Sequence, residues 1–118
     1  MAANAWTKVE DITFVEAWEE VYVNPPRRGQ GGLWVRVQQY FAQLRGPNYD
    51  RTVNALSSRF RVILLECKKF ESYYKSVENS SEGLSEDDIK AVGLINFRHD
   101  EGHDFEHVSQ WETIRVWI

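Results

Sequence analysis

The chain has 118 residues, 42% of them hydrophobic, so it can bury one substantial core but is too short for two ordinary domains. Its single cysteine, Cys67, excludes an internal disulfide and lies in an apolar run, which predicts a buried thiol in a reducing, intracellular compartment. No apolar run approaches roughly 20 residues and the first residues lack a signal-peptide pattern, so we expect neither a membrane span nor secretion.

The formal charge of −4 is distributed unevenly along the chain. Residues 51–75 hold six basic and two acidic side chains, whereas residues 76–112 hold two basic and ten acidic ones. Charges farther apart than a Debye length of roughly 8–10 Å are screened from one another, so a basic segment can bind phosphate within an acidic protein. The middle of the chain is therefore the candidate for nucleic-acid contact.

A first helix is predicted at about residues 9–23. Thr7 and Glu10 have the spacing of a capping box, in which the hydroxyl and the carboxylate each accept a backbone N–H at the helix start. Asn24 precedes Pro25. A proline disfavours the helical conformation in the residue before it, so we expect the helix to end there. The apolar residues of the predicted inner face are Phe14, Val15, Trp18, Val21 and Tyr22.

Residues 25–32 form a loop rich in Pro, Arg and Gly that contains Arg27 and Arg28. The loop lacks the final Gly-Lys-Ser/Thr of a phosphate-binding P-loop, so we interpret it as a basic connector. A second helix follows and ends before Gly46. Its apolar stripe consists of Leu33, Trp34, Val37, Phe41 and Leu44.

The third periodic segment starts near Arg51 and contains neither Gly nor Pro as far as Glu82. The pattern fits one long helix, or a helix that breaks near Phe70 and then resumes. Ser85 and Asp88 have the spacing of a second capping box, which predicts a helix at about residues 86–96. Apolar residues recur between residues 105 and 118, so we expect a packed terminal segment there.

The order of these segments and their spaced aromatic residues resemble the Myb/SANT-like domain of plant proteins derived from Harbinger-type transposons, relatives of the trihelix transcription factors. The matching residues include Trp6-Thr7, Glu10-Asp11, Ala17-Trp18, Gln30, Trp34, Tyr40-Phe41, Arg51-Thr52, Arg59-Phe60 and Ile63. The resemblance implies an all-α fold with a three-helix core, a helix-turn-helix variant, at residues 1–75. Residues 76–118 would be an acidic helical extension packed on the same single domain. The predicted core residues are Trp6, Trp18, Trp34, Phe41, Leu56 and Phe60.

The resemblance also implies a nuclear, transposon-derived or transcription-regulator-type protein that binds double-stranded DNA with its third helix in the major groove. If Leu56 and Phe60 face inward, the opposite face presents Asn54, Ser58 and Arg61 to base edges. The predicted phosphate contacts are Arg51, Lys68, Lys69, Arg27 and Arg28. The alternative is a SANT-type protein-interaction module that recruits a chromatin-associated or nuclease-like transposase partner without binding DNA itself.

One rival chemical pattern is a histidine series. His99, His103 and His107 recur every four residues, and on a helix their imidazoles would share a face suited to a metal ion. Gly102 disfavours a helix there and no second ligand cluster supports the site, so we predict a solvated acidic loop and no metal. Cys67 has no evident base partner and the carboxylates show no distinct pair. We therefore expect neither an enzyme nor a cofactor.

Overall fold

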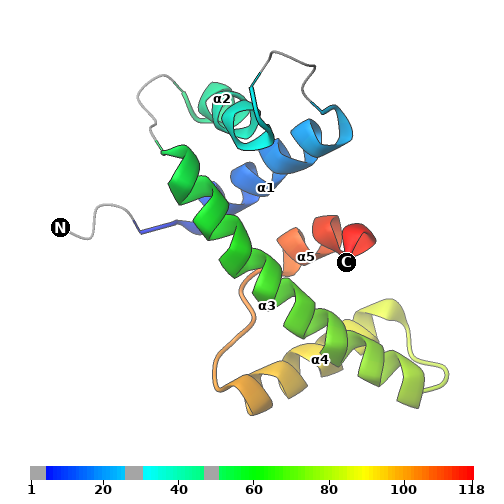
Figure 1. Cartoon of the computed structure of the whole chain (residues 1–118). Coiled ribbons are helices and arrows are strands. Elements are labelled where there is room, and N and C mark those ends of the chain that lie inside the picture. The colour runs from blue at the N-terminus through cyan, green and yellow to red at the C-terminus, as the bar shows by residue number, and fades with distance from the viewer. Residues whose placement is uncertain (1–4, 26–30, 47–50) are drawn as a thin grey trace. The chain divides into compact units, whose positions relative to one another are not determined.

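The computed structural model describes residues 5–25, 31–46 and 51–118 (Figure 1). Within these ranges the regular structure is entirely helical, which confirms the predicted all-α class. The elements are α1 (Lys8–Val23), α2 (Leu33–Arg45), α3 (Val53–Ser80), α4 (Glu86–Glu101), α5 (Val108–Ile114) and the short 3₁₀ helix η1 (Arg115–Trp117). No described helix combines the length and apolar character that crossing a membrane requires.

The chain divides into two compact units, Met1–Arg61 and Val62–Ile118, and the division falls within α3. We expected a three-helix core up to residue 75 and an extension from residue 76, a boundary that lies inside the second unit. The division also separates charge. The first unit has eight basic and six acidic side chains, a formal charge of +2, whereas the second has six basic and twelve acidic ones, a charge of −6.

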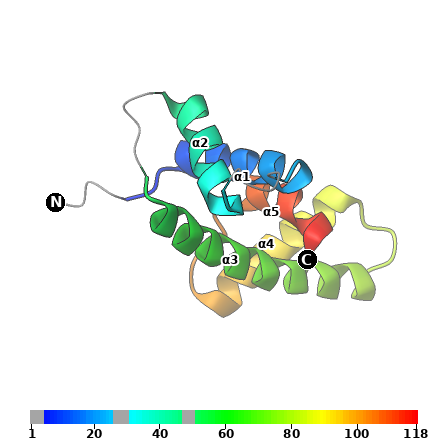
Figure 2. The same ribbon diagram turned by 45° about the horizontal axis from the view of Figure 1, so that its top comes forward.

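The start of α1 confirms the predicted capping box. The Glu10 backbone N–H donates to Thr7 Oγ1 at 3.1 Å, and the Thr7 N–H donates to Glu10 Oε1 at 3.2 Å. The helix therefore begins at Lys8, one residue before the predicted start, and ends at Val23. Figure 2 shows α2 lying against α1, and Phe14 and Phe41 bring the two helices together with ring centroids 5.7 Å apart.

An aromatic cluster forms the centre of the first unit. Among the predicted core residues, Trp18, Phe41 and Leu56 are buried. The other three, Trp6, Trp34 and Phe60, are half-buried but all contact the Phe14 ring, at centroid distances of 5.3, 6.2 and 6.3 Å. The N-terminal part of α3 thereby packs, through Phe60, on residues from α1 and α2.

Two positions of the predicted apolar faces are wrong. Tyr22 is exposed, because it lies next to Val21 at the edge of the buried face, where its ring packs on Trp18. Leu44 is exposed as well, in the last turn of α2 and beyond Phe41, the last buried residue of that helix. Neither change affects the rest of the core.

In the second unit, α3 continues past Phe70 without a break and ends at Ser80, which decides between the two open alternatives in favour of one helix. Phe70 is fully buried, stacked on Phe105 at 4.6 Å and edge-on to Trp111 at 4.8 Å. Trp111 and Ile114 of α5 are also fully buried, which confirms the predicted packing for this part of the terminal segment. Val116, Trp117 and Ile118 are exposed, so the expected packing is wrong for the last residues.

One of the two hydrogen bonds of the capping box predicted for α4 is present, with the Asp88 N–H donating to Ser85 Oγ at 3.2 Å. The helix ends at Glu101, five residues later than the predicted end at Asn96. Gly102 explains this end, because its left-handed conformation, φ 83°, lets its N–H close the last turn on the Arg98 carbonyl at 3.0 Å. The α4 helix crosses the second part of α3 (Figures 1 and 2), and the ring centroids of Phe70 and Phe97 lie 6.4 Å apart there.

Candidate nucleic-acid interface

The first three turns of α3 carry the side chains predicted to contact bases. Asn54, Ser58 and Arg61 are exposed, whereas Leu56 is fully buried. Residues at i, i+4 and i+7 lie on one face of an α-helix, so the three side chains share one face. The backbone and burial pattern thus bring the predicted base-contact residues together on the first unit.

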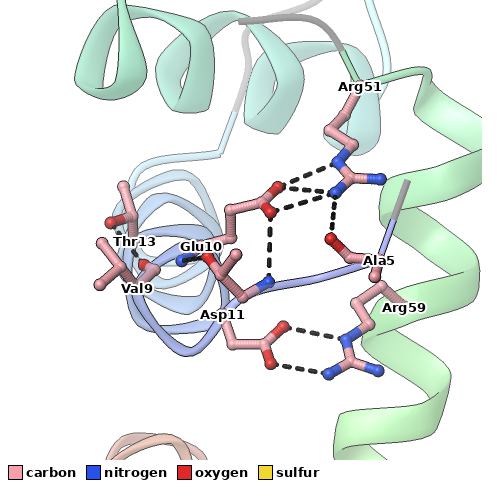
Figure 3. A network of polar contacts seen from close by, with 8 residues as sticks. Ala5, Val9, Glu10, Asp11, Thr13, Arg51 and Arg59 are labelled. Atoms are coloured by element: carbon pink, nitrogen blue, oxygen red, sulfur yellow. Dashed lines mark hydrogen bonds and ion pairs between the residues drawn. The ribbon is translucent and has the colours of Figure 1, made fainter. Parts of the chain in front are cut away.

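Two other arginines, Arg51 just before α3 and Arg59 within it, point towards the first turn of α1 and bind its carboxylates (Figure 3). Arg51 donates from Nε to Glu10 Oε2 at 3.0 Å and from Nη2 to Glu10 Oε1 at 3.1 Å. Its Nη2 also donates to the Ala5 carbonyl at 3.2 Å, and its guanidinium lies 4.3 Å from the Trp6 ring centroid. The Glu10 carboxylate that caps α1 therefore also binds the segment that leads into α3.

Arg59 makes the second link. Its Nε donates to Asp11 Oδ1 at 2.9 Å and its Nη2 donates to Asp11 Oδ2 at 2.7 Å, a bidentate pair that is also drawn in Figure 3. Both carboxylates, Glu10 and Asp11, are buried in the first turn of α1. Paired guanidiniums compensate the desolvation of these carboxylates, because each supplies two charge-assisted hydrogen bonds.

These two ion pairs change the roles that we predicted for arginines of the basic segment, residues 51–75. Arg51, predicted to contact phosphate, has its guanidinium bound to Glu10. Arg59 was not predicted as a site residue, and its guanidinium is bound to Asp11. Arg61 differs from both, because it is exposed and forms no ion pair with any described residue. Of these three arginines, Arg61 is the one whose charge faces solvent.

The remaining predicted phosphate contacts lie elsewhere. Arg27 and Arg28 fall outside the described residues. Lys68 and Lys69 are exposed residues of the second unit, and Lys69 Nζ lies 3.2 Å from Glu101 Oε1. The structure therefore brings together the base-contact residues, but not the full set of phosphate contacts, on one described unit.

A polar group in the second unit surrounds Glu101. The Tyr73 hydroxyl donates to Glu101 Oε2 at 2.8 Å, and this hydrogen bond, with a smaller contribution from Lys69, lowers the pKa of the Glu101 carboxyl. The same hydrogen bond raises the pKa of Tyr73 to about 12. The carboxylate is thus stabilised in its charged form and the phenol in its neutral form.

The three histidines of the rival metal pattern do not share a helix face. His99 is in the last turn of α4 and its Nδ1 lies 2.9 Å from Asp100 Oδ1, whereas Gly102 ends the helix before His103. His103 Nε2 lies 3.6 Å from Glu66 Oε1, and His107 is buried before α5. Across the described ranges, no group of three or more His, Cys, Asp or Glu side chains could hold a metal ion.

Cys67 is buried in α3, as its apolar surroundings in the sequence predicted. Burial, together with the nearby charge of Glu66, raises the pKa of the thiol to about 12. A thiol with this pKa stays protonated at neutral pH, and the thiolate is the form that acts as a nucleophile. Cys67 therefore behaves as a small core residue.

No protein-family model, no curated protein and no solved structure matches this chain. Any function proposed for this chain therefore rests on its sequence and on the geometry of the described residues.

Proposed function

We propose that the first unit is a Myb/SANT-like, helix-turn-helix domain that binds double-stranded DNA, in a nuclear protein of the transposon-derived or transcription-regulator type. The first turns of α3 would lie in the major groove, with Asn54, Ser58 and Arg61 at base edges. The proposal involves no catalysis and no cofactor. The observation that carries it is the different surroundings of the arginines at this end of α3: Arg51 and Arg59 are bound to α1, and Arg61 is exposed to solvent.

The size and chemistry of this face support the proposal. Seven residues of helix rise by about 10 Å, so Asn54 and Arg61 would span a distance close to the major-groove width of roughly 12 Å. Arginine donates bidentately to guanine, asparagine pairs with adenine, and a serine hydroxyl can bond to either base. The formal charge of +2 on this unit favours approach to a polyanion, although the whole chain is acidic.

The two links between α1 and α3 support the proposal in a second way. A reading helix has to be held rigidly, because base contacts are lost when the helix shifts by about 1 Å. The Glu10–Arg51 and Asp11–Arg59 pairs fix α3 to α1 and also neutralise two carboxylates of this unit. Arg51 would have to leave Glu10 to reach a phosphate, so we assign it a positioning role. Lys68, Lys69, Arg27 and Arg28 remain the predicted phosphate contacts.

The test is selection of bound sequences from a random pool of duplexes, followed by titration of the selected duplex with the whole chain. We expect an enriched sequence, and we expect the double variant Asn54→Ala, Arg61→Ala to bind it at least tenfold more weakly, since each base contact contributes about 1–3 kcal/mol. The matched control is Asn96→Ala, Arg98→Ala, which removes the same side-chain types from exposed positions of α4.

Circular dichroism of each variant establishes that the helices are intact. A pool that stays unenriched, or equal affinity of the Asn54, Arg61 variant and the wild type across a salt series, would reject DNA reading by this face. A loss of the same size in the α4 control would also reject it, because that loss would reflect net charge only.

The second candidate is a SANT-type protein-interaction module that recruits a chromatin-associated or nuclease-like partner without binding DNA. The observation that favours it is the second unit, whose formal charge of −6 repels phosphate. Absence of duplex binding at low salt, together with retained capture of a defined partner, would favour this candidate over the first.

A further inference from the structure

The outer face of α1 carries exposed apolar side chains followed by carboxylates. Val9 is 59% exposed and Ile12 is 42% exposed, and Glu16 continues the series at an i, i+3, i+7 spacing. Phe14 and Trp18 are buried on the other side of the same helix. We call residues Val9, Ile12, Glu16 and Glu20 the α1 stripe, in which Glu20 lies one turn beyond Glu16.

The α1 stripe opposes the electrostatics of its own helix. Glu16 and Glu20 are like charges four residues apart, and negative charge near a helix C-terminus opposes the helix dipole. The last turn of α1 has no basic residue, and no described basic side chain forms an ion pair with Glu16 or Glu20. Local conflicts of this kind occur where a surface serves another purpose than the stability of its own helix.

The second unit carries a stripe with the same spacing and the opposite charge. Val62 is 48% exposed and Leu65 is 58% exposed, and Lys69 completes the i, i+3, i+7 series on α3. Lys68 is exposed next to Lys69. We call these four residues the α3 stripe. Lys69 contacts Glu101, and its side chain is 42% exposed.

We propose that the α1 stripe of one copy of the chain binds the α3 stripe of a second copy. In a parallel, coiled-coil-like pairing with a shared register, Val9 lies opposite Val62 and Ile12 lies opposite Leu65. In the same register Glu16 meets Lys69, and Lys68 flanks Glu20. In heptad terms the two apolar pairs occupy an a and a d position, where such residues bury one another. Glu16 and Lys69 occupy the next a position, and Lys68 and Glu20 form a flanking g–e pair. Polar pairs at these positions set the register and the choice of partner.

Three independent features favour a second copy as the occupant. The apolar residues of the two stripes have identical spacing, their charges are complementary, and both stripes are exposed in the described residues. Like charges disfavour pairing of either stripe with its own equivalent, so we place the contact between two different surfaces. The inference goes beyond DNA binding and requires no nucleic acid.

The test is a charge-swap experiment on the whole chain without DNA, read by sedimentation over a concentration series. The acidic-to-basic variant is Glu16→Lys, Glu20→Lys, and the basic-to-acidic variant is Lys68→Glu, Lys69→Glu. We expect the wild type to self-associate and each variant alone to associate at least tenfold more weakly. An equimolar mixture of the two variants should associate again, because both of its cross-copy stripe pairs combine opposite charges.

A matched control is Glu82→Lys, Glu106→Lys, which changes the net charge as the α1 variant does but alters exposed residues outside both stripes. It should associate like the wild type. A wild-type chain that stays monomeric at all concentrations overturns the proposal. So does a mixture of the two swapped variants that associates no better than each alone, because the contact would then not be between these stripes.

Discussion

Arg59 and Asp11 are joined by two parallel hydrogen bonds, from Nε to Oδ1 and from Nη2 to Oδ2, although 48 positions separate them in the sequence. The carboxylate side chain is 6% exposed and the guanidinium side chain is 22% exposed. An ion pair at the surface contributes little to stability, whereas removal of one partner from a buried pair costs several kcal/mol. The unequal exposure of the two side chains therefore predicts unequal effects of their removal.

We expect Arg59→Ala to lower the free energy of unfolding by about 2–4 kcal/mol, because the buried Asp11 carboxylate loses two charge-assisted hydrogen bonds. Asp11→Ala should cost less, since the more exposed guanidinium can be hydrated. Urea unfolding followed by circular dichroism gives both values. A double-mutant cycle of the two changes should give a coupling energy of about 1–3 kcal/mol.

The control for this cycle is the pair Arg98 and Asp104, which has a similar distance of 2.7 Å but lies at 69% and 63% side-chain exposure. Its coupling energy should be about 0–0.5 kcal/mol, since solvent screens it. Equal coupling in the two pairs would show that burial does not strengthen the link between Arg59 and Asp11. A larger loss in Asp11→Ala than in Arg59→Ala would contradict the predicted asymmetry.

Gly93 is a buried residue of α4 that lies against α3 in the second unit. A Cβ at this position would lie 3.4 Å from Phe70 Cε1 and 3.7 Å from the Tyr74 Cα, which are ordinary contact distances. We expect Gly93→Ala to raise the free energy of unfolding by about 0.5–1 kcal/mol, because alanine restricts the unfolded chain and favours the helix. Gly93→Leu should lower it by about 1–3 kcal/mol through overpacking.

Gly102→Ala provides the contrast, and urea unfolding measures all three variants. Gly102 has φ +83° and open space around its Cβ position, so alanine there is strained by the backbone and not by its neighbours. We expect a loss of about 1–2 kcal/mol for it. A destabilising Gly93→Ala would contradict the conclusion that α3 leaves room for a methyl group at this position. A stabilising Gly102→Ala would contradict the predicted backbone strain at Gly102.

The helices could be predicted closely from the sequence because their signals are local. The cap formed by Thr7 and Glu10 determines where α1 starts, and the proline after Asn24 determines where it ends. The sequence predicts the end of α4 too early, because the polar residues from His99 onward indicate a loop, whereas the helix continues to Glu101 and is capped by Gly102. The absence of Gly and Pro in α3 could not by itself exclude a break near Phe70, since packing on Phe105 and Trp111 holds that part of the helix.

The candidate interface could be predicted only in part, for a related reason. The spacing of Asn54, Ser58 and Arg61 correctly predicted a shared exposed face, because helix periodicity alone determines it. The partners of Arg51 and Arg59 could not be read in this way, because Glu10 and Asp11 are more than forty positions away. The sequence did contain one signal for these partners, the adjacent Glu10-Asp11 pair close to the predicted aromatic core. Carboxylates that are buried in such a place require basic partners, because an unpaired buried charge is costly.

The hydrogen bond between Tyr73 and Glu101 predicts how the second unit responds to pH. It contributes most to the lowered pKa of Glu101, and Lys69 contributes second. We therefore expect Tyr73→Phe to raise the pKa of Glu101 towards its ordinary value, and Lys69→Gln to raise it by less. An NMR titration of the Glu101 carboxyl carbon measures both changes. A larger rise in the Lys69 variant, or an unchanged pKa in the Tyr73 variant, would contradict this order.

The sign of the stability change follows from the two pKa shifts. Because the folded pKa of Glu101 is lowered, its contribution to stability is present above the ordinary value of 4.5 and is lost as the pH falls through the folded pKa. Because the folded pKa of Tyr73 is raised from 10.0 to about 12, its contribution is present below pH 10.0 and is lost as the pH rises towards 12. Tyr73→Phe should thus lower the unfolding temperature near neutral pH and converge with the wild type at both extremes. If the unfolding temperatures of the two proteins differed by the same amount at every pH, the hydrogen bond would not be the cause of the pH-dependent stability.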